Sequence, residues 1–237
     1  IAMEVTVDFR EAAFGTKKDI KLYKTITCKT CSGSGAQPNT PINTCKQCGG
    51  RGQVGTVKQT IFGAVQALTT CPQCKGSGKH IEKPCKECRG VGVSKAEERF
   101  DITIPAGINN GETLRIKGQG EAGLHGGPSG DLYITVRVKG DKRFVREGYD
   151  LHIDLPIRFT QSVLGDTISV ETLDGSTDVK IPAGTQSGTV FRVQNQGVPF
   201  LHKKGRGDLL VTVNILTPSH ISRKQRELLE KLKEENL

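Results

Sequence analysis

Apolar and polar residues alternate along several short runs of this chain, which is the pattern of β-strands with one buried face. Such runs cover residues 3–9, 18–26, 132–138 and 209–215. The first two runs are joined by a short helical turn over residues 11–14, which ends at a glycine. The pattern therefore predicts a mainly β protein built from short strands.

An internal repeat arranges these strands in two copies. Residues 101–107, Asp-Ile-Thr-Ile-Pro-Ala-Gly, recur as residues 178–184, Asp-Val-Lys-Ile-Pro-Ala-Gly, and further matches follow without a gap at the same offset of 77. Upstream, residues 7–15 match residues 157–165 at an offset of 150. Because the two offsets differ by 73 residues, the first copy carries an insertion of about that length between its second and third strands.

The repeat predicts two tandem homologous β-sandwich domains. The expected divisions of the chain are a first β-sandwich over residues 1–27 and 93–140, a Cys-rich insertion over 28–92, a second β-sandwich over 141–218 and a C-terminal helix over 219–237. Within the insertion, residues 53–70 are expected to form a hairpin that turns near Phe62 and Gly63.

The C-terminal helix is expected to present one apolar stripe. Ser222 and Gln225 have the spacing of a capping box, and Leu228, Leu229 and Leu232 fall on one helix face. Packing of this stripe on its own domain and self-association of two chains both satisfy the pattern. Our hypothesis for this helix is a homodimer contact.

All eight cysteines lie in the insertion, in four copies of the pattern C-x-x-C-x-G-x-G. The four pairs are Cys28 and Cys31, Cys45 and Cys48, Cys71 and Cys74, and Cys85 and Cys88. Two residues between cysteines let both sulfurs bind one tetrahedral metal ion at about 2.3 Å, and the glycines permit the tight turn that follows. Eight thiolates therefore predict two Zn²⁺ ions per chain, each with four cysteines. Zinc would supply folding free energy that the few large apolar residues of this segment cannot.

Paired cysteines have two other common uses, a disulfide framework and a C-x-x-C redox centre. A redox centre needs one reactive pair in a strand-to-helix turn, whereas this chain has four equal pairs in Gly-rich turns. Thiol-disulfide exchange also requires free thiolates, and zinc-bound thiolates are occupied. The pattern favours metal knuckles.

Composition and charge narrow the function further. Counting eight thiolates and two Zn²⁺ ions lowers the formal net charge from +9 to +5, which weakens an argument from charge for nucleic-acid binding. The chain has no Trp and three Tyr, so the knuckles lack the aromatic platforms that single strands stack on. No apolar run of 18 residues and no signal peptide is present, and metal-bound cysteines fit the cytoplasm or an organelle matrix. No nucleotide-binding loop is found.

Two tandem β-domains with four cysteine knuckles inserted in the first resemble the substrate-binding part of the zinc-containing (type A) J-domain co-chaperones, the DnaJ family. Further markers are Phe-Arg-Glu-Ala-Ala-Phe-Gly at 9–15, Glu-Ala-Gly at 121–123, Gly-Asp-Leu-Tyr at 130–133 and Thr-Leu-Asp-Gly at 172–175. The resemblance covers essentially the whole chain. One departure is plain, because the family's helical J-domain bears His-Pro-Asp and none of the five histidines here precedes Pro-Asp. We therefore expect the chain to be a piece of a longer protein.

The resemblance also implies a pairing of the knuckles and a peptide groove. One zinc would be shared by Cys28, Cys31, Cys85 and Cys88, and the other by Cys45, Cys48, Cys71 and Cys74. The family's client groove lies on the first β-domain, where an extended peptide adds a strand to a sheet edge. The matching positions here are Ile1, Ile20, Leu22, Phe100 and Ile134. A role in the ordinary sandwich core explains each of these five residues equally well.

The function that the resemblance implies is ATP-independent binding of non-native polypeptides. The chain would prevent their aggregation and deliver them to a DnaK-type ATPase chaperone. The zinc module would be structural and would assist client transfer. No enzymatic reaction is expected.

Overall fold

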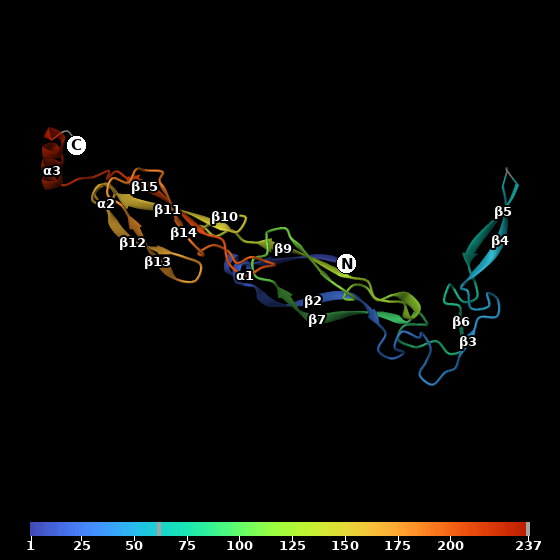
Figure 1. Cartoon of the computed structure of the whole chain (residues 1–237). Helices are drawn as coiled ribbons and strands as arrows, with labels where there is room; N and C mark the ends of the chain where they lie inside the picture. Colours follow the sequence, from blue (N-terminus) through green and yellow to red (C-terminus); the bar gives the residue numbers. More distant parts are fainter. Residues whose placement is uncertain (61–62, 236–237) are drawn as a thin grey trace. The chain divides into compact units, whose positions relative to one another are not determined.

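The structure is a computed structural model that describes residues 1–60 and 63–235, and it confirms a mainly β fold (Figure 1). Its elements, in chain order, are β1 (Ala2–Val7), α1 (Phe9–Phe14), β2 (Thr16–Thr27), β3 (Ile42–Thr44), β4 (Gln53–Thr60), β5 (Gly63–Thr70), β6 (Lys79–Ile81), β7 (Val93–Ile104), β8 (Thr113–Ile116), the 3₁₀ turn η1 (Leu124–Gly126), β9 (Leu132–Val138), β10 (Val145–Glu147), β11 (Asp150–Arg158), α2 (Phe159–Leu164), β12 (Asp166–Glu171), β13 (Ser176–Ile181), β14 (Val190–Val193), β15 (Leu209–Leu216) and α3 (Arg223–Glu234).

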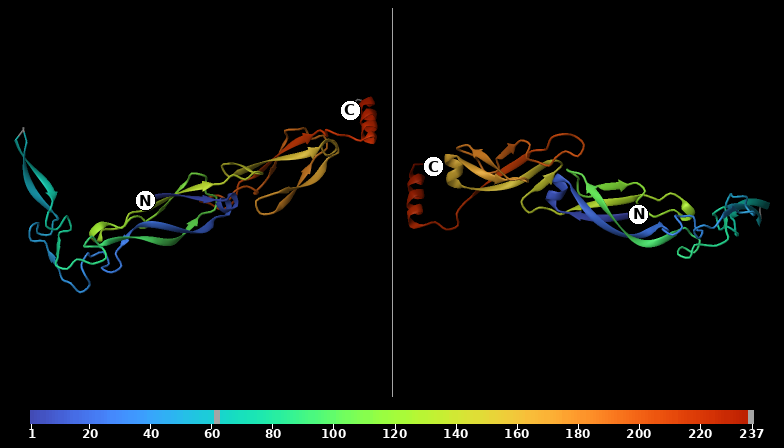
Figure 2. Two further views of the ribbon diagram at one scale, coloured as in Figure 1. Left: turned by 180° about the vertical axis from the view of Figure 1, so that it is seen from behind. Right: turned by 90° about the horizontal axis from the view of Figure 1, so that it is seen from below.

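The sequence repeat is visible in the strand pairings. The sheet β1-β9-β8 has its counterpart in β11-β15-β14, and the pair β2-β7 has its counterpart in β12-β13. In the second copy, β11 and β15 run parallel, with Leu151 opposite Leu209 and Arg158 opposite Leu216. The Cys-rich segment lies between β2 and β7, so its two ends join paired strands. Figure 2 shows these strands from two further sides.

The chain divides into two compact units. Unit 1 comprises residues 1–5, 18–102 and 112–136, and unit 2 comprises residues 6–17, 103–111 and 137–237. The core of unit 2 lies between its sheets, and the alternation of β15 builds much of it, because Leu209, Val211 and Val213 are fully buried. Two-residue periodicity turns every second side chain of a strand to the same face, so this burial follows from the sequence pattern.

Unit 2 includes a part of the first repeat that packs on the second. The ring of Phe9 stacks on that of Phe144, with centroids 6.3 Å apart. The guanidinium of Arg146 donates to the carbonyl oxygens of Gly107 and Ile108, each at 2.7 Å. The backbone of Gly107 lies close to that of Pro199. A Cβ added at Gly107 would lie 2.1 Å from the carbonyl oxygen of Pro199. Aromatic stacking and charge-assisted hydrogen bonds thus tie α1 and its neighbours into this unit.

The element ends differ from the sequence pattern where caps intervene. The alternation of residues 3–9 counts Phe9 as strand, but β1 ends at Val7 and Phe9 begins α1. Asp8 explains the change, because its N–H donates to Glu11 Oε2 at 2.8 Å within a capping box. The expected hairpin is formed by β4 and β5, which pair from Gln53–Thr70 to Thr60–Gly63. Its expected turn near Phe62 falls outside the described residues.

The C-terminal helix α3 begins at Arg223, directly after the predicted N-cap residue Ser222. Ser222 Oγ accepts from the N–H of Gln225 at 3.3 Å, and Ser222 N–H donates to Gln225 Oε1 at 2.8 Å. None of the residues of α3 is buried, and the stripe of Leu228, Leu229 and Leu232 is 40–53% exposed. The stripe therefore has no cover within unit 2 as described.

Each repeat contains the same carboxylate anchor. Asp208 accepts hydrogen bonds from Arg192 Nε at 2.5 Å and from the N–H of Asn195 at 2.8 Å. Its equivalent, Asp131, accepts from Arg115 Nε at 2.7 Å and from the N–H of Gly118 at 2.9 Å. In both cases the backbone N–H and the guanidinium hold the pKa of the carboxyl below its usual value.

We expect Asp208→Asn to lower the free energy of unfolding of unit 2 by about 2 kcal/mol at pH 7, because the side chain is nearly buried and its donors lose a charged acceptor. A depressed folded pKa contributes stability above the unfolded value of about 3.9, and this contribution is lost as pH falls through the folded pKa. Urea unfolding of both proteins should therefore show the gap close below about pH 4. Asp178→Asn, at an exposed position of β13, is the control, and an equal loss there would contradict the prediction.

Candidate metal centres

The structure brings the eight cysteines together as two groups of four. Cys28, Cys31, Cys85 and Cys88 form the outer group, and Cys45, Cys48, Cys71 and Cys74 form the inner group. Within each group all four sulfurs lie within 4.8 Å of one another, and all eight side chains are buried. The first knuckle thus meets the fourth, and the second meets the third.

The sulfur positions fit a tetrahedral metal ion. Four sulfurs at about 2.3 Å from one ion lie about 3.8 Å apart. The measured Sγ–Sγ distances are 3.9 Å for Cys28–Cys85, 3.6 Å for Cys31–Cys88, 3.9 Å for Cys45–Cys71 and 3.7 Å for Cys48–Cys74. A disulfide would need about 2.05 Å, so these cysteines are unbonded thiols in metal-ligand geometry.

Reciprocal backbone hydrogen bonds hold each pair of knuckles together. In the outer group, Cys28 N–H donates to the carbonyl oxygen of Gly92 at 3.0 Å, and Cys85 N–H donates to that of Gly35 at 2.8 Å. The inner group repeats the arrangement, with Cys45 bonded to Gly78 and Cys71 bonded to Gly52, each at 2.9 Å. The first residue of each knuckle is therefore hydrogen-bonded to the last residue of the partner knuckle. This reciprocal arrangement makes each site nearly two-fold symmetric.

The last glycine of a knuckle lies against the backbone of the partner knuckle. Gly52 has φ +73°, its N–H donates to Cys48 Sγ at 3.2 Å, and an added Cβ would lie 2.4 Å from the carbonyl oxygen of Gly76. Gly35 is placed in the same way against Gly90. Only glycine combines this positive φ with so close an approach of two backbones.

We expect Gly52→Ala to lower the metal affinity of the inner site at least about tenfold, because left-handed strain and the clash with Gly76 together cost 1–3 kcal/mol or more. Competition with a chromophoric chelator would measure this affinity. Gly55→Ala on the neighbouring strand is the matched control, since an added Cβ there meets nothing within 4 Å. Unchanged affinity in the Gly52 variant would show that the two turns do not need this contact.

Charge within each group favours a cation. Burial raises the pKa of the Cys28 thiol to about 12. Burial also acts on Cys31, but the N–H of Gly35 and the thiol of Cys88 outweigh it and lower the pKa of Cys31 to about 7. Two thiols whose pKa values differ as much as those of Cys28 and Cys31 do not ionise together at neutral pH, whereas a divalent ion stabilises the thiolate form of its ligands. The donor set fits Zn²⁺, which prefers four soft sulfur ligands in a tetrahedron.

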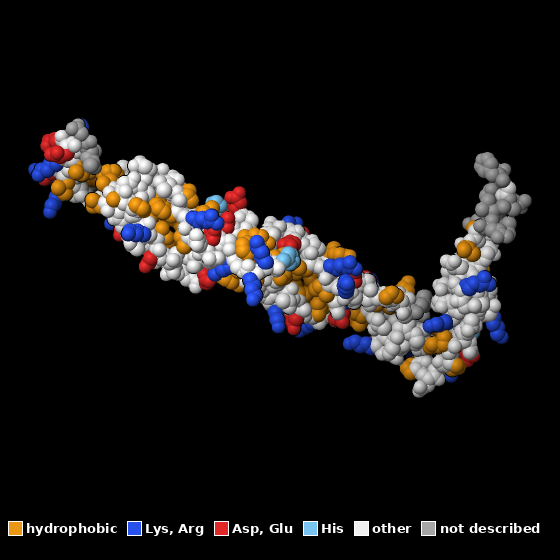
Figure 3. All heavy atoms as spheres, in the orientation of Figure 1, with side chains coloured by type: hydrophobic (Ala, Val, Ile, Leu, Met, Phe, Trp, Pro, Cys, Tyr) orange, Lys and Arg blue, Asp and Glu red, His pale blue; other side chains and the backbone are white. Residues whose placement is uncertain are grey.

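Basic side chains surround these sites, and Figure 3 shows blue Lys and Arg side chains standing out from the visible face of the Cys-rich module. Residues 28–92 hold nine Lys and Arg against two Asp and Glu. Six of the nine lie inside the knuckles, namely Lys29, Lys46, Arg51, Lys75, Lys86 and Arg89.

The five residues expected to line a peptide groove all belong to unit 1. Ile20 on β2 and Ile134 on β9 are buried, at 8% and 0% exposure, so they lie in the core. Ile1, Leu22 and Phe100 are half-buried and present part of their side chains to solvent. The structure leaves these three as the residues that a bound peptide could reach.

Sequence reasoning missed a buried cation beside these residues. Lys24 is 5% exposed, pairs with Glu98 at 2.9 Å, and donates to the carbonyl oxygen of Gln119 at 2.8 Å. Its ammonium lies 5.6 Å from the ring centroid of Phe100. The signal was present in the alternation, because a lysine two residues after Leu22 on β2 takes an inward position.

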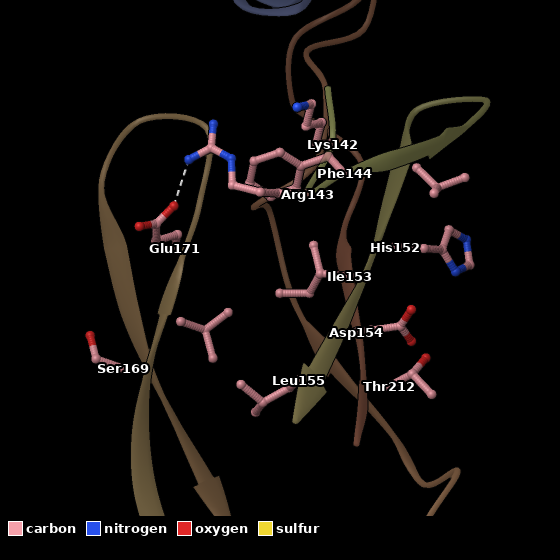
Figure 4. A pocket seen from close by; sticks show the side chains of 12 residues that line it. Lys142, Arg143, Phe144, His152, Ile153, Asp154, Leu155, Ser169, Glu171 and Thr212 are labelled. Carbon is pink, nitrogen blue, oxygen red and sulfur yellow. Dashed lines mark hydrogen bonds and ion pairs between the residues drawn. The ribbon is translucent and has the colours of Figure 1, made fainter. Parts of the chain in front are cut away.

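A cavity of about 370 Å³ in unit 2 was also missed (Figure 4). Its apolar lining comes from Phe144, Val145, Ile153, Leu155 and Val170. Figure 4 shows Arg143 reaching toward Glu171 at one side, and the two form an ion pair at 2.5 Å. Val170 is the equivalent of Ile20 at the offset of 150 residues. Because Ile20 was expected to line a groove in the first repeat, the repeat could have pointed to Val170 in the second.

Within the described part of the chain, no helix is long and apolar enough to cross a membrane.

Comparison with known proteins supports one family. The profile of the DnaJ C terminal domain family matches residues 1–218. Proteins named Chaperone protein DnaJ are similar to the chain. That of Acetivibrio thermocellus is 47% identical over 228 residues, which is 96% of this chain and 59% of the relative. That of Thermosynechococcus vestitus is 49% identical over 230 residues, 97% of this chain and 62% of the relative.

The relative from Halalkalibacterium halodurans is 44% identical over 225 residues, 95% of this chain and 61% of the relative. The chain thus spans about three fifths of the length of the relatives it matches. The family profile covers both the Cys-rich segment with its two groups of four cysteines and the repeated strand arrangement. We conclude that this chain belongs to the DnaJ C-terminal domain family.

Proposed function

We propose that this chain binds non-native polypeptides, keeps them from aggregating and hands them to a DnaK-type ATPase chaperone. The observation that carries the proposal is the match to proteins named Chaperone protein DnaJ over at least 95% of the chain. The half-buried apolar side chains of Leu22 and Phe100 in unit 1 support it. The proposed role involves no enzymatic reaction, only binding and release.

Non-native polypeptides share an unpaired backbone and exposed apolar side chains. An extended segment would add a strand to a sheet edge of unit 1, and its backbone hydrogen bonds would form whatever its sequence. One apolar side chain would pack beside Leu22 and Phe100, with Ile20 and Ile134 forming the buried floor. Main-chain pairing with a single apolar contact gives broad specificity, which suits a binder of many unfolded chains.

We further propose that the two cysteine groups hold two Zn²⁺ ions. The outer ion would be held by Cys28, Cys31, Cys85 and Cys88, and the inner ion by Cys45, Cys48, Cys71 and Cys74. Zinc would stabilise the fold of the module without redox chemistry. A module held rigid in this way can assist the transfer of a client. The proposed location is the cytoplasm or an organelle matrix, where thiols stay reduced.

A variant at the groove tests the proposal. We expect Leu22→Ser to weaken binding of a denatured, fluorescently labelled test protein about tenfold, because an apolar contact worth about 1.5 kcal/mol is lost. Light scattering would show correspondingly poorer suppression of aggregation. Tyr23→Ser is the matched control, since Tyr23 is the next residue of β2, points to the other face and is 69% exposed. Equal binding by both variants would place the groove elsewhere, and no binding by the unaltered chain would refute the proposed function.

A further inference from the structure

The inner metal site lies in a stretch of the chain that has no carboxylate side chain. Residues 20–81 contain no Asp or Glu, although the whole chain has 25, and the same stretch carries eight Lys and Arg. The outer site is different, because Glu87 accepts a hydrogen bond from Thr30 there. The surface around the inner site is therefore basic without local neutralisation.

Four basic residues define this surface, which we call the inner basic surface: Lys46, Arg51, Lys75 and Lys79. All four are exposed, and within residues 1–60 and 63–235 their side chains form no ion pair. A site of four thiolates and one Zn²⁺ carries a charge of −2, so four cations exceed what the site needs. The surplus remains available to a partner.

Backbone contacts bring these cations close together. A Cβ added at Gly52 would lie only 2.4 Å from the carbonyl oxygen of Gly76, so the two turns touch. Arg51 precedes the first of these glycines and Lys75 precedes the second. Like charges carried on two touching turns repel each other and gain from a shared counter-charge.

The other two cations adjoin the same turns through the β3–β6 pair. Lys79 is paired in register with Thr44, which lies two residues before Lys46. The neighbouring hairpin offers a way to hold an extended chain, because in the described structure β4 and β5 pair only with each other and each keeps one free edge. Leu68 on β5 adds a 75% exposed apolar side chain.

We propose that the inner basic surface binds an acidic, extended polypeptide segment of a partner protein. A second copy of this chain is a poor occupant, because outside residues 28–92 it carries 25 Lys and Arg against 23 Asp and Glu and so has no acidic excess. Single-stranded nucleic acid is also disfavoured, since residues 28–92 contain no Trp or Tyr for bases to stack on. Binding of an acidic extended peptide requires only the cations, which pair with its carboxylates, and a strand edge, which pairs with its backbone.

This inference rests on the metal ions of the proposed function, so metal content is measured first. The test uses the full chain with two Zn²⁺ bound and fluorescently labelled poly-L-glutamate as the probe. Lys46→Gln, Arg51→Gln and Lys79→Gln are combined in one variant. The control combines Lys17→Gln, Lys180→Gln and Lys204→Gln, which remove the same charge from exposed positions of unit 2.

The inner variant should bind poly-L-glutamate about tenfold more weakly at low salt, because each exposed ion pair is worth about twofold in affinity. The control should stay within about twofold, and added salt should remove the difference between the two. Equal losses in both variants would show that only overall charge matters and would overturn the proposal. A single-stranded oligonucleotide that binds more tightly than poly-L-glutamate, and loses affinity in the same variant, would also overturn it. If every variant still holds a denatured test protein, the proposed function does not depend on the inner basic surface.

Discussion

Replacing Cys48 or Cys71 with serine will release one metal ion and unfold the inner part of the Cys-rich module, while the outer site stays intact. The inner group has almost no apolar packing of its own, because its buried cluster consists of the four cysteines with Val54 beside them. Structural zinc contributes about 10–16 kcal/mol of apparent binding free energy at such sites, far more than one partly buried valine. Without the ion, the base of the β4–β5 hairpin loses its anchor.

Replacing Cys28 or Cys88 should have a different result. Cys28 directly follows β2, and Cys88 lies five residues before β7, so an ion bound at the outer site would close the module where it joins these paired strands. Loss of this ion will loosen both ends of the module and leave the inner site folded. Both sets of variants should therefore keep one metal ion per chain, against two in the unaltered protein.

Metal content by mass spectrometry and mapping of protease cleavage sites distinguish these outcomes. Inner variants should be cut between residues 45 and 74, and outer variants near residues 28–44 and 75–92. Gln37→Ala, an exposed position between the two sites, is the control and should keep both ions. Identical cleavage maps for the inner and outer variants would contradict the pairing, and four disulfides in the purified protein would refute the metal sites.

We propose that α3 joins two chains, and we expect deletion of residues 219–237 to leave a monomer and to weaken the proposed holding of unfolded protein by about a hundredfold or more. A helix of 12 residues is marginal alone in water, and α3 has only local support, such as the Arg223–Glu227 pair at 3.3 Å. Its stripe of Leu228, Leu229 and Leu232 is exposed, so burial against a partner would stabilise it. Two chains carry two grooves, and linked weak sites gain about 10²–10⁴ in avidity.

Analytical ultracentrifugation at micromolar concentration measures the first effect, and aggregation suppression measures the second. A triple variant, Leu228→Ala, Leu229→Ala and Leu232→Ala, should behave like the deletion while keeping the helix sequence. Replacing Glu230 and Lys231 on the same helix by alanine is the control. A full chain that sediments as a monomer would show that the stripe packs within its own chain, and the helix would then lose its proposed role.

The local pattern of the sequence carried much of the fold. Alternation at 132–138 matches β9, and the offset of 77 residues maps β8 onto β14 and β9 onto β15. The spacing of Ser222 and Gln225 located the start of α3. These features depend on neighbours in the chain, because side-chain direction in a strand and capping at a helix end are decided within a few residues.

Tertiary structure decided which distant segments meet. Spacing alone predicted four equal cysteine pairs, and nothing local selects a partner for any of them. The choice is made by the reciprocal bonds of Cys28 with Gly92 and of Cys85 with Gly35, which join segments 50 or more residues apart. The strand order imposes this choice, since β2 and β7 lie side by side and deliver the first and fourth knuckles to one place.

The groove and the buried lysine of unit 1 show the same limit. Five apolar residues suited a peptide groove by resemblance, but only burial in three dimensions separates Ile20 and Ile134 in the core from the reachable Leu22 and Phe100. The inward position of Lys24 could be read from alternation, whereas its partner Glu98 could not. Alternation tells which face of a strand is buried, because that face repeats every two residues. What lies against the face depends on contacts between strands far apart in sequence, and those contacts exist only once the chain has folded.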